Sequence, residues 1–159
     1  HYLDTIIMGY EKLEAEVETR SNVDDFFELL TKQAHLAIEA TDLVHKVELH
    51  EGEWDKPGHV KTWHYTTIEG EKEEFKEKFE VDEANKTCTM EAVGGHILEQ
   101  VKSYKIIYKC IPKEAGGGVV KITLEYQLFK PEDAHPEKYI PFLVKFVQDI
   151  DAGVADPVV

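Results

Sequence analysis

The sequence predicts an α+β fold in which a curved, seven-stranded antiparallel sheet surrounds one long C-terminal helix. Apolar and polar residues alternate along a series of short segments, which is typical of strands with one buried face. Short turns separate most of these segments, so neighbouring strands should pair antiparallel. Near the C-terminus the pattern changes to a wide apolar stripe at helical spacing, which predicts a helix that covers the sheet.

The first strand and two short helices precede the other strands. Residues 13–17 alternate between apolar side chains and glutamates, which indicates a half-exposed strand. Ser21-Asn22 then offers an N-cap, and apolar residues at helical spacing follow it. We therefore expect an amphipathic helix after Asn22 and a second helical segment over residues 33–40.

Six further alternating segments begin at Val44, and each would turn one set of side chains towards the interior. These sets comprise Val47 and Leu49; Trp63 and Tyr65; Phe75, Phe79 and Val81; Cys88, Met90 and Ala92; Tyr104, Ile106, Tyr108 and Cys110; and Val120, Ile122, Leu124 and Tyr126. Seven strands close only part of the way around a helix. A gap between the sheet and the helix would therefore form an internal hydrophobic cavity.

The C-terminal helix contains an apparent conflict. Pro136 suits a first helical turn, and an apolar stripe follows at Tyr139, Phe142, Leu143, Phe146, Val147 and Ile150. Pro141 lies within that stripe, so the helix should either kink or begin after Pro136. We expect residues 1–159 to form a single domain, with residues 1–8 as a leader or as residues added before an original start, and residues 153–159 as a flexible tail.

Composition excludes several classes of protein. The chain has 159 residues and a formal net charge of −14, which argues against nucleic acids and anionic membranes as partners. No apolar run approaches the length needed to span a bilayer. The two cysteines, Cys88 and Cys110, fit neither a disulfide framework nor a zinc site, and we expect both to be buried. We expect a cytoplasmic protein without a bound metal.

The segment Leu49 to Val60 is bounded by glycines, like a loop that cradles a phosphate. It lacks the Gly-Lys-Ser/Thr ending of such loops, carries three acids and leads into a strand instead of a helix. We therefore interpret it as a structural turn bounded by Gly52 and Gly58.

Several motifs occur in a specific order between about Gly9 and Ala152. They are Lys12-Leu13-Glu14, Asp25-Phe26-Phe27-Glu28-Leu29-Leu30, the Glu51 to Gly58 loop, Val60-Lys61-Thr62-Trp63-His64-Tyr65, Asp82-Glu83 with Asn85-Lys86-Thr87, Lys109 to Pro112, and Lys145-Phe146 to Asp151. Together they resemble the major latex protein branch of the plant birch-pollen-allergen family, the class 10 pathogenesis-related proteins of the START-like superfamily.

This resemblance implies the helix-grip fold with a large, mostly apolar cavity. Members bind hydrophobic or phenolic plant metabolites, so the expected partner is a small terpenoid, phenolic or alkaloid. A minority are enzymes without cofactors. The resemblance therefore also allows a cyclase or isomerase acting on an iridoid, as in nepetalactol formation, or on a benzylisoquinoline alkaloid intermediate.

The resemblance and the alternation of the strands indicate the same cavity wall. The expected ligand-binding residues are Trp63, Tyr65, Phe79, Met90, Ala92, Tyr104, Tyr108, Ile122, Leu124, Tyr126, Phe142 and Phe146. Each of them could instead be a core residue. Four of them are tyrosines, whose buried hydroxyls need partners, and this favours a cavity over a solid core.

Three residues are candidates for moving a proton. Glu77 shares the parity of its apolar neighbours, and a carboxylate facing an apolar cavity would have a raised pKa, although it could instead be solvated near a strand end. His96 follows two glycines where the family's cavity has its entrance, and Tyr104 faces inward. No lysine is expected inside, because Lys61, Lys105, Lys109 and Lys121 have outward parity or lie at strand ends.

Two functions from different classes remain open. The first is a carrier that binds a metabolite without changing it, as a monomer or a weak homodimer. The second is an enzyme that needs no cofactor and uses the shape of the cavity to position a reactive substrate. We favour binding. A hormone receptor of the abscisic-acid type shares the fold, but the loops around residues 69–71 and 94–98 do not match its gate and latch motifs.

Overall fold

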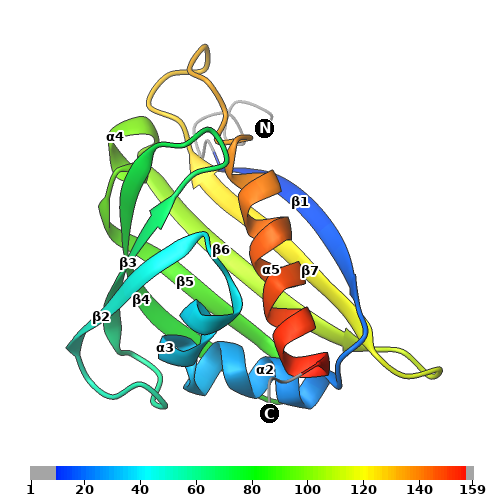
Figure 1. The fold of residues 1–159 in the computed structure, drawn as a ribbon. Coiled ribbons are helices and arrows are strands. Elements are labelled where there is room, and N and C mark those ends of the chain that lie inside the picture. The colour runs from blue at the N-terminus through cyan, green and yellow to red at the C-terminus, as the bar shows by residue number, and fades with distance from the viewer. Residues whose placement is uncertain (1–9, 157–159) are drawn as a thin grey trace.

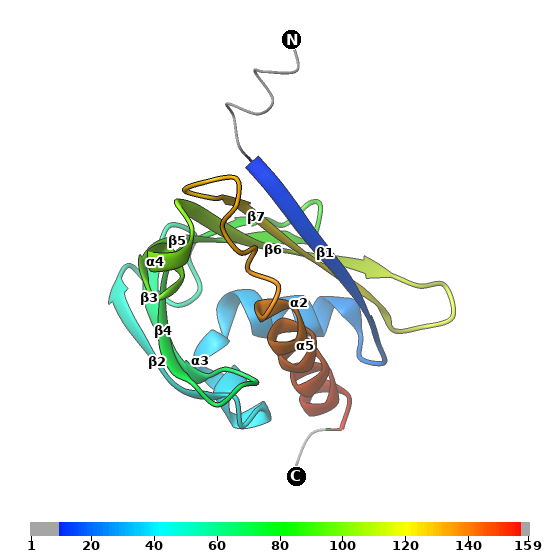
Figure 2. The same cartoon turned by 90° about the horizontal axis from the view of Figure 1, so that it is seen from above.

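The computed structural model describes residues 10–156, and their seven strands form one antiparallel sheet that curves around a long helix (Figures 1 and 2). The spatial order is β1-β7-β6-β5-β4-β3-β2. The strands are β1 (Tyr10–Thr19), β2 (Val44–Glu51), β3 (Val60–Thr66), β4 (Lys72–Asp82), β5 (Thr87–Gly95), β6 (Ser103–Pro112) and β7 (Gly118–Gln127). The predicted α+β helix-grip architecture is confirmed.

The short helices lie between β1 and β2, as the sequence predicted. Helix α2 (Val23–Lys32) begins after Asn22, whose side chain accepts hydrogen bonds from the backbone N–H groups of Asp24 and Asp25 at 2.8 and 3.2 Å. The expected second segment divides into α3 (Ala34–Ala37) and a 3₁₀ turn, η1 (Ile38–Ala40). A further short helix, α4 (Ile97–Gln100), connects β5 to β6.

The long helix α5 (Tyr139–Ala155) begins after Pro136, so Pro141 lies in its first turn. N–H groups in the first turn have no acceptor within the helix, and a proline there removes no hydrogen bond. The helix also extends through Ala155, so the expectation of an irregular tail from Gly153 is wrong for Gly153–Ala155. Asp156 follows as the C-cap of the helix. Residues 157–159 of that tail and the expected leader, residues 1–8, lie outside the described residues.

The loop between β2 and β3 is a structural turn. Gly52 and Gly58 adopt φ angles of 80° and 83°, a region that strongly favours glycine. The N–H of Gly58 donates to the carbonyl of Phe79 at 2.6 Å, and the N–H of Phe79 donates to the carbonyl of His59 at 2.9 Å. These bonds hold the end of the loop against β4, and they fix where β3 begins.

Helix α5 lies inside the curve of the sheet, along the side formed by β1 and β7 (Figures 1 and 2). Near its C-terminal end the Asp151 carboxylate accepts hydrogen bonds from the backbone N–H groups of Arg20 and Ser21. These bonds join α5 to the connection between β1 and α2. No helix in the described part of the chain is long and apolar enough to cross a membrane.

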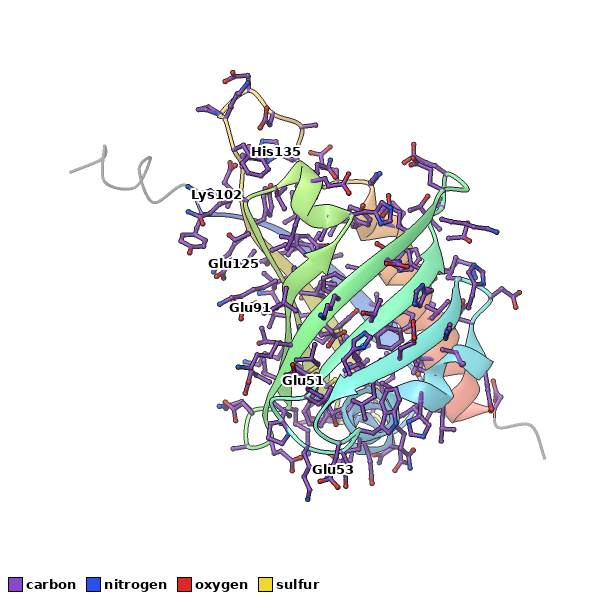
Figure 3. The ribbon with its side chains drawn as sticks, turned by 90° about the vertical axis from the view of Figure 1, so that its left-hand side faces the viewer. Glu51, Glu53, Glu91, Lys102, Glu125 and His135 are labelled. Carbon is purple, nitrogen blue, oxygen red and sulfur yellow. The ribbon has the colours of Figure 1, made fainter. Side chains whose placement is uncertain are left out.

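Most of the acidic side chains lie outside the core. Figure 3 shows Glu51 and Glu53 at one end of the sheet and Glu91 and Glu125 along its length. Among residues 10–156, the acids with buried side chains are Glu73, Glu77 and Asp151. Asp151 holds α5 in place, which leaves Glu73 and Glu77, both on β4, as the carboxylates nearest the interior of the curve.

Candidate functional site

A cavity lies between α5 and the part of the sheet formed by β3, β4, β5 and β6. It has a volume of about 50 Å³, room for a few water molecules. Its wall is formed by Val44, Trp63, Tyr65, Phe75, Met90, Ile97, Tyr104, Ile106, Tyr108, Tyr139, Phe142, Leu143 and Phe146. The wall contains no charged side chain, and its polar atoms belong to tyrosines and to Trp63.

The structure brings seven of the twelve expected ligand-binding residues into this wall. They are Trp63, Tyr65, Met90, Tyr104, Tyr108, Phe142 and Phe146. The other five, Phe79, Ala92, Ile122, Leu124 and Tyr126, are not part of it. Ile122 and Leu124 are fully buried on β7, on the side of the sheet along which α5 runs, so they pack in the core.

Phe79 and Tyr126 are occupied by other contacts. The Phe79 ring stacks on His59 with centroids 4.8 Å apart, and the Lys61 ammonium lies 4.6 Å from its centroid. The Tyr126 hydroxyl forms a 2.6 Å hydrogen bond with Nδ1 of His135. Ala92 is half-buried.

Six wall residues were absent from the predicted list. Phe75 and Ile106 have the inward parity of their strands, and Tyr139 and Leu143 belong to the apolar stripe of α5, so a signal for them existed. Val44 and Ile97 contribute from the first residue of β2 and of α4. Alternation carries no information about such positions, because they depend on how the segments before them pack.

Two of the wall tyrosines share one carboxylate. The Tyr139 and Tyr65 hydroxyls donate to Oε1 of Glu73 at 2.6 and 3.0 Å. The Lys138 ammonium lies 3.4 Å from Oε2 of the same group. Burial raises the pKa of both phenols, and the neighbouring acidic groups add to the effect. Both hydroxyls therefore stay protonated and remain donors to Glu73.

The other two wall tyrosines, Tyr104 and Tyr108, lie on the same face of β6. Within residues 10–156, neither hydroxyl has a hydrogen-bond partner, although the Tyr104 ring packs edge-on against Phe75 and Tyr139. Burial is the largest cause of the raised pKa of each phenol. Each is thus a protonated, unbonded donor in the wall.

A buried cluster of four polar side chains lies beside the cavity, and we call it the Glu77 cluster: His59, Lys61, Trp63 and Glu77. Lys61 Nζ donates to Glu77 Oε2 at 3.1 Å, and the Trp63 indole N–H donates to Glu77 Oε1. The Lys61 and Glu77 side chains are 1% and 0% exposed. The expectation that Lys61 points outward is therefore wrong.

The reason for this error lies in the register. Lys61 shares the parity of Trp63 and Tyr65, and it faces Glu77 directly across the β3–β4 pair. Lys61 lies within β3, which begins at Val60, so the alternation of the strand fixes its side chain on the inner face. Lys105 and Lys121 are half-buried and Lys109 is exposed, so none of these three lies in the core.

His59 completes the cluster and was not singled out by the sequence. Its Nδ1 lies 2.8 Å from the carbonyl oxygen of Lys56, which can only accept, so Nδ1 carries the proton. Nε2 then accepts from Lys61 Nζ at 2.5 Å. Burial and the Lys61 charge both lower the pKa of His59, so the ring is neutral.

The three candidate proton handlers lie in different surroundings. Tyr104 is in the wall. Glu77 is buried with a raised pKa caused mainly by desolvation, and it is bonded to the wall residue Trp63 without lining the cavity itself. His96 is exposed before α4, where Nδ1 accepts the N–H of Glu74 at 3.0 Å. The structure therefore does not bring the three together in one site.

Metal binding and catalysis by a cysteine are not supported by the residues that the structure describes. Within them, no group of three or more His, Cys, Asp or Glu side chains has the arrangement of a metal site. Cys88 and Cys110 are both buried free thiols, and burial raises the pKa of each. A buried thiol with a raised pKa is a poor nucleophile.

The chain is similar to known plant proteins. Residues 8–156 match the sequence model described as "Pathogenesis-related protein Bet v 1 family". The chain is 33% identical over 140 residues to MLP-like protein 329 of Arabidopsis thaliana, and the match covers 87% of this chain and 92% of that protein.

Two solved structures are also similar. Major latex-like protein 151 of Panax ginseng superposes with a TM-score of 0.86 at 28% identity, over 92% of this chain and 98% of that one. Norcoclaurine synthase of Thalictrum flavum, solved with dopamine and hydroxybenzaldehyde, gives a TM-score of 0.73 over 94% and 89% of the two chains. At 18% identity, the latter shows a shared fold only.

Proposed function

The chain belongs to the pathogenesis-related Bet v 1 family, which is known for ligand binding, and from this premise we propose that it binds a small hydrophobic plant metabolite in its cavity. We expect the ligand to be a terpenoid, a phenolic or an alkaloid. The observation that carries the proposal is the cavity wall, which is apolar and aromatic with a few tyrosine hydroxyls. Ligand sites generally combine an apolar wall with a small number of placed polar groups.

The cavity must enlarge before it can hold such a ligand. A space of about 50 Å³ holds a few water molecules, whereas a metabolite with one or two rings needs more. Wall side chains must therefore move when the ligand enters. Met90 suits this role, because an unbranched thioether side chain repacks at low cost.

Binding without chemical change is consistent with the positions of the two buried carboxylates on β4. Glu73 is bonded to two phenols and faces Lys138, and Glu77 is bonded to Lys61 and Trp63. Neither carboxylate belongs to the wall. We accordingly favour a carrier of a single domain, acting in the cytoplasm as a monomer or a weak homodimer without a cofactor.

Native mass spectrometry with time points tests this proposal. The protein is incubated with a panel of plant terpenoids, phenolics and alkaloids, and both the complex and the free compounds are followed. We expect at least one compound to bind unchanged. Met90→Trp, which fills the cavity, should abolish that binding, whereas Val93→Trp, on the exposed face of the same strand, should not. Equal binding to both variants would place the ligand outside the cavity.

One observation supports a second candidate function, a cyclase or isomerase that needs no cofactor. Glu73 is a buried carboxylate that accepts from two wall phenols, so one phenol can take a proton from a substrate in the cavity while it gives its own proton to Glu73. An iridoid or a benzylisoquinoline alkaloid intermediate would be the substrate. Tyr104 would act from the wall, and His96 would act only near the end of the cavity closed by α4. Glu77 would orient the Trp63 ring, because an indole N–H only donates and does not relay protons.

The same incubation separates the two functions. A carrier leaves the bound compound unchanged at all times, whereas an enzyme changes the distribution of products. If products form, Glu73→Gln should alter their ratio or rate, and Glu71→Gln, at an exposed neighbour that also contacts Lys138, should not. Product formation that is unaffected by Glu73→Gln would remove Glu73 from the mechanism.

A further inference from the structure

The cavity has an excess of hydrogen-bond donors. Tyr104 and Tyr108 both line it, and neither hydroxyl has an acceptor among the residues that the structure describes. The cavity has room for a few water molecules, which can accept from these hydroxyls in the free protein. A ligand that fills the cavity displaces this water, so it must supply an acceptor itself or leave a buried donor unpaired, which is costly. The Tyr104 and Tyr108 hydroxyls therefore have no acceptor from the described protein, and a ligand can supply one.

The buried acceptors nearby are already engaged. Glu73 receives the Tyr65 and Tyr139 hydroxyls on one oxygen and faces Lys138 on the other. Glu77 receives Lys61 and Trp63. Neither carboxylate accepts a hydrogen bond from Tyr104 or Tyr108, and each already faces a lysine instead of a cation in the cavity.

We propose that the ligand is a neutral molecule with a carbonyl or a comparable acceptor oxygen, which receives a hydrogen bond from Tyr104 or Tyr108. This inference rests on the proposed binding function and narrows it. It favours ketones, aldehydes, esters and lactones with an apolar frame over protonated amines. Because burial raises the pKa of both phenols, they remain donors into the alkaline range.

Two probes of equal shape test the inference by equilibrium dialysis. 2-Acetylnaphthalene carries a carbonyl, and 2-isopropenylnaphthalene replaces its oxygen with a CH₂ group. The alkene leaves water more readily than the ketone, so each probe is compared between protein variants instead of with the other probe. The variants are Tyr104→Phe and Tyr108→Phe, with Tyr126→Phe as the matched control because that hydroxyl is bonded to His135 away from the wall.

We expect at least one of the two wall variants to bind the ketone about three- to tenfold more weakly, the usual effect of losing one hydrogen bond. Binding of the alkene should not weaken in that variant, and Tyr126→Phe should bind both probes like the unaltered protein. The carbonyl stretch of the bound ketone should also shift to higher frequency in the same variant, because its hydrogen bond is lost.

Three other outcomes would contradict the account. If both probes bind and neither Tyr104→Phe nor Tyr108→Phe weakens the ketone, the inference fails and the proposed function stands. If protonated 2-naphthylmethylamine binds as tightly as the ketone, the preference for a neutral ligand is wrong. If no naphthalene probe binds, the same variants are compared with a carbonyl compound that binds in the metabolite panel. If no compound of either set binds the unaltered protein, the proposed function fails together with the inference.

Discussion

Trp63 joins the cavity to the Glu77 cluster beside it. Its ring lines the cavity and packs edge-on against Phe146 with centroids 5.8 Å apart, and its indole N–H donates to Glu77. Glu77 is held in turn by Lys61, and Lys61 by His59. The orientation of a wall residue therefore depends on a buried ion pair that does not itself reach the cavity.

The first prediction concerns this ion pair. Lys61→Met leaves a buried carboxylate without a cation, and it should lower the free energy of unfolding by about 3–5 kcal/mol. The double variant Lys61→Met/Glu77→Gln removes both charges and keeps an acceptor for Trp63, so it should recover more than about half of that loss. Urea denaturation followed by circular dichroism measures both values.

Lys113→Met is the matched control, since it breaks an exposed pair with Glu18. Such pairs contribute less than about 1 kcal/mol. If Lys61→Met cost no more than Lys113→Met, the Lys61–Glu77 pair would have no structural importance. A double variant as unstable as the single one would show that the loss comes from packing instead of the unpaired charge.

The second prediction concerns His59 and pH. Burial, followed by the Lys61 charge, lowers the pKa of this imidazole below its usual value. Between that lowered pKa and about 6.5 the unfolded chain binds more protons than the folded protein, so stability rises with pH through this window and is lost as the pH falls. One such group contributes at most about 1.4 kcal/mol per pH unit.

Urea denaturation from pH 5 to pH 8 measures the effect. In His59→Gln the dependence on pH below about 6.5 should be shallower than in the unaltered protein. Glu77, whose raised pKa gives a slope of opposite sign at acid pH, is present in both proteins. Parallel curves for the two proteins would mean that His59 binds a proton equally well in the folded and unfolded states.

For individual residues, the alternation along a strand predicts well which side chains face inward. For residues outside regular strands it predicts nothing. Glu77 faces inward as its spacing indicates, and Lys61 would have been found by applying the same count from Trp63. His59 gave no signal, because it lies in the loop before β3. Only the hydrogen bonds between that loop and β4 turn its ring into the core.

At the scale of elements, α5 depends on one carboxylate near its C-terminal end. Asp151 accepts hydrogen bonds from the N–H groups of Arg20 and Ser21 at 2.9 to 3.1 Å, and its side chain is buried. Removing this side chain would leave both backbone N–H groups without their carboxylate acceptor. The position of α5 against β1, and with it one wall of the cavity, should therefore be sensitive to Asp151.

The third prediction follows from this contact. Asp151→Ala leaves two backbone N–H groups without their carboxylate partner and should lower the free energy of unfolding by about 2–4 kcal/mol. Asp156→Ala breaks an exposed pair with the Arg20 side chain and should cost less than about 1 kcal/mol. Thermal or urea denaturation compares them, and equal losses would contradict the anchoring role of Asp151.

The elements themselves could be predicted because each has a local cause. Alternation identified the strands, the Asn22 cap identified the start of α2, and Pro141 limited where α5 could begin. The C-terminal end of α5 was harder to place. Gly153 suggests a stop, but the helix continues to Ala155, since Val154 packs on the core.

At the scale of the whole molecule, the shape of the cavity depends on where α5 lies inside the sheet. The sequence predicted the inward faces of all the later strands, but it treated the whole inner surface as cavity wall. Because α5 runs along β1 and β7, inward residues of β7 such as Ile122 and Leu124 pack in the core, and the cavity remains on the side of β3 to β6. No alternation pattern contains that asymmetry.

The central claim is that this cavity binds the ligand, and methyl NMR of Met90 tests it most directly. Met90 lines the cavity, and the sequence has two methionines, so protein labelled with ¹³C at the methionine methyl groups gives few signals, and Met90→Leu assigns them. A compound that binds in the mass-spectrometric screen should shift the Met90 signal in proportion to occupancy. A saturating, bound compound that leaves the Met90 signal unchanged would contradict the account.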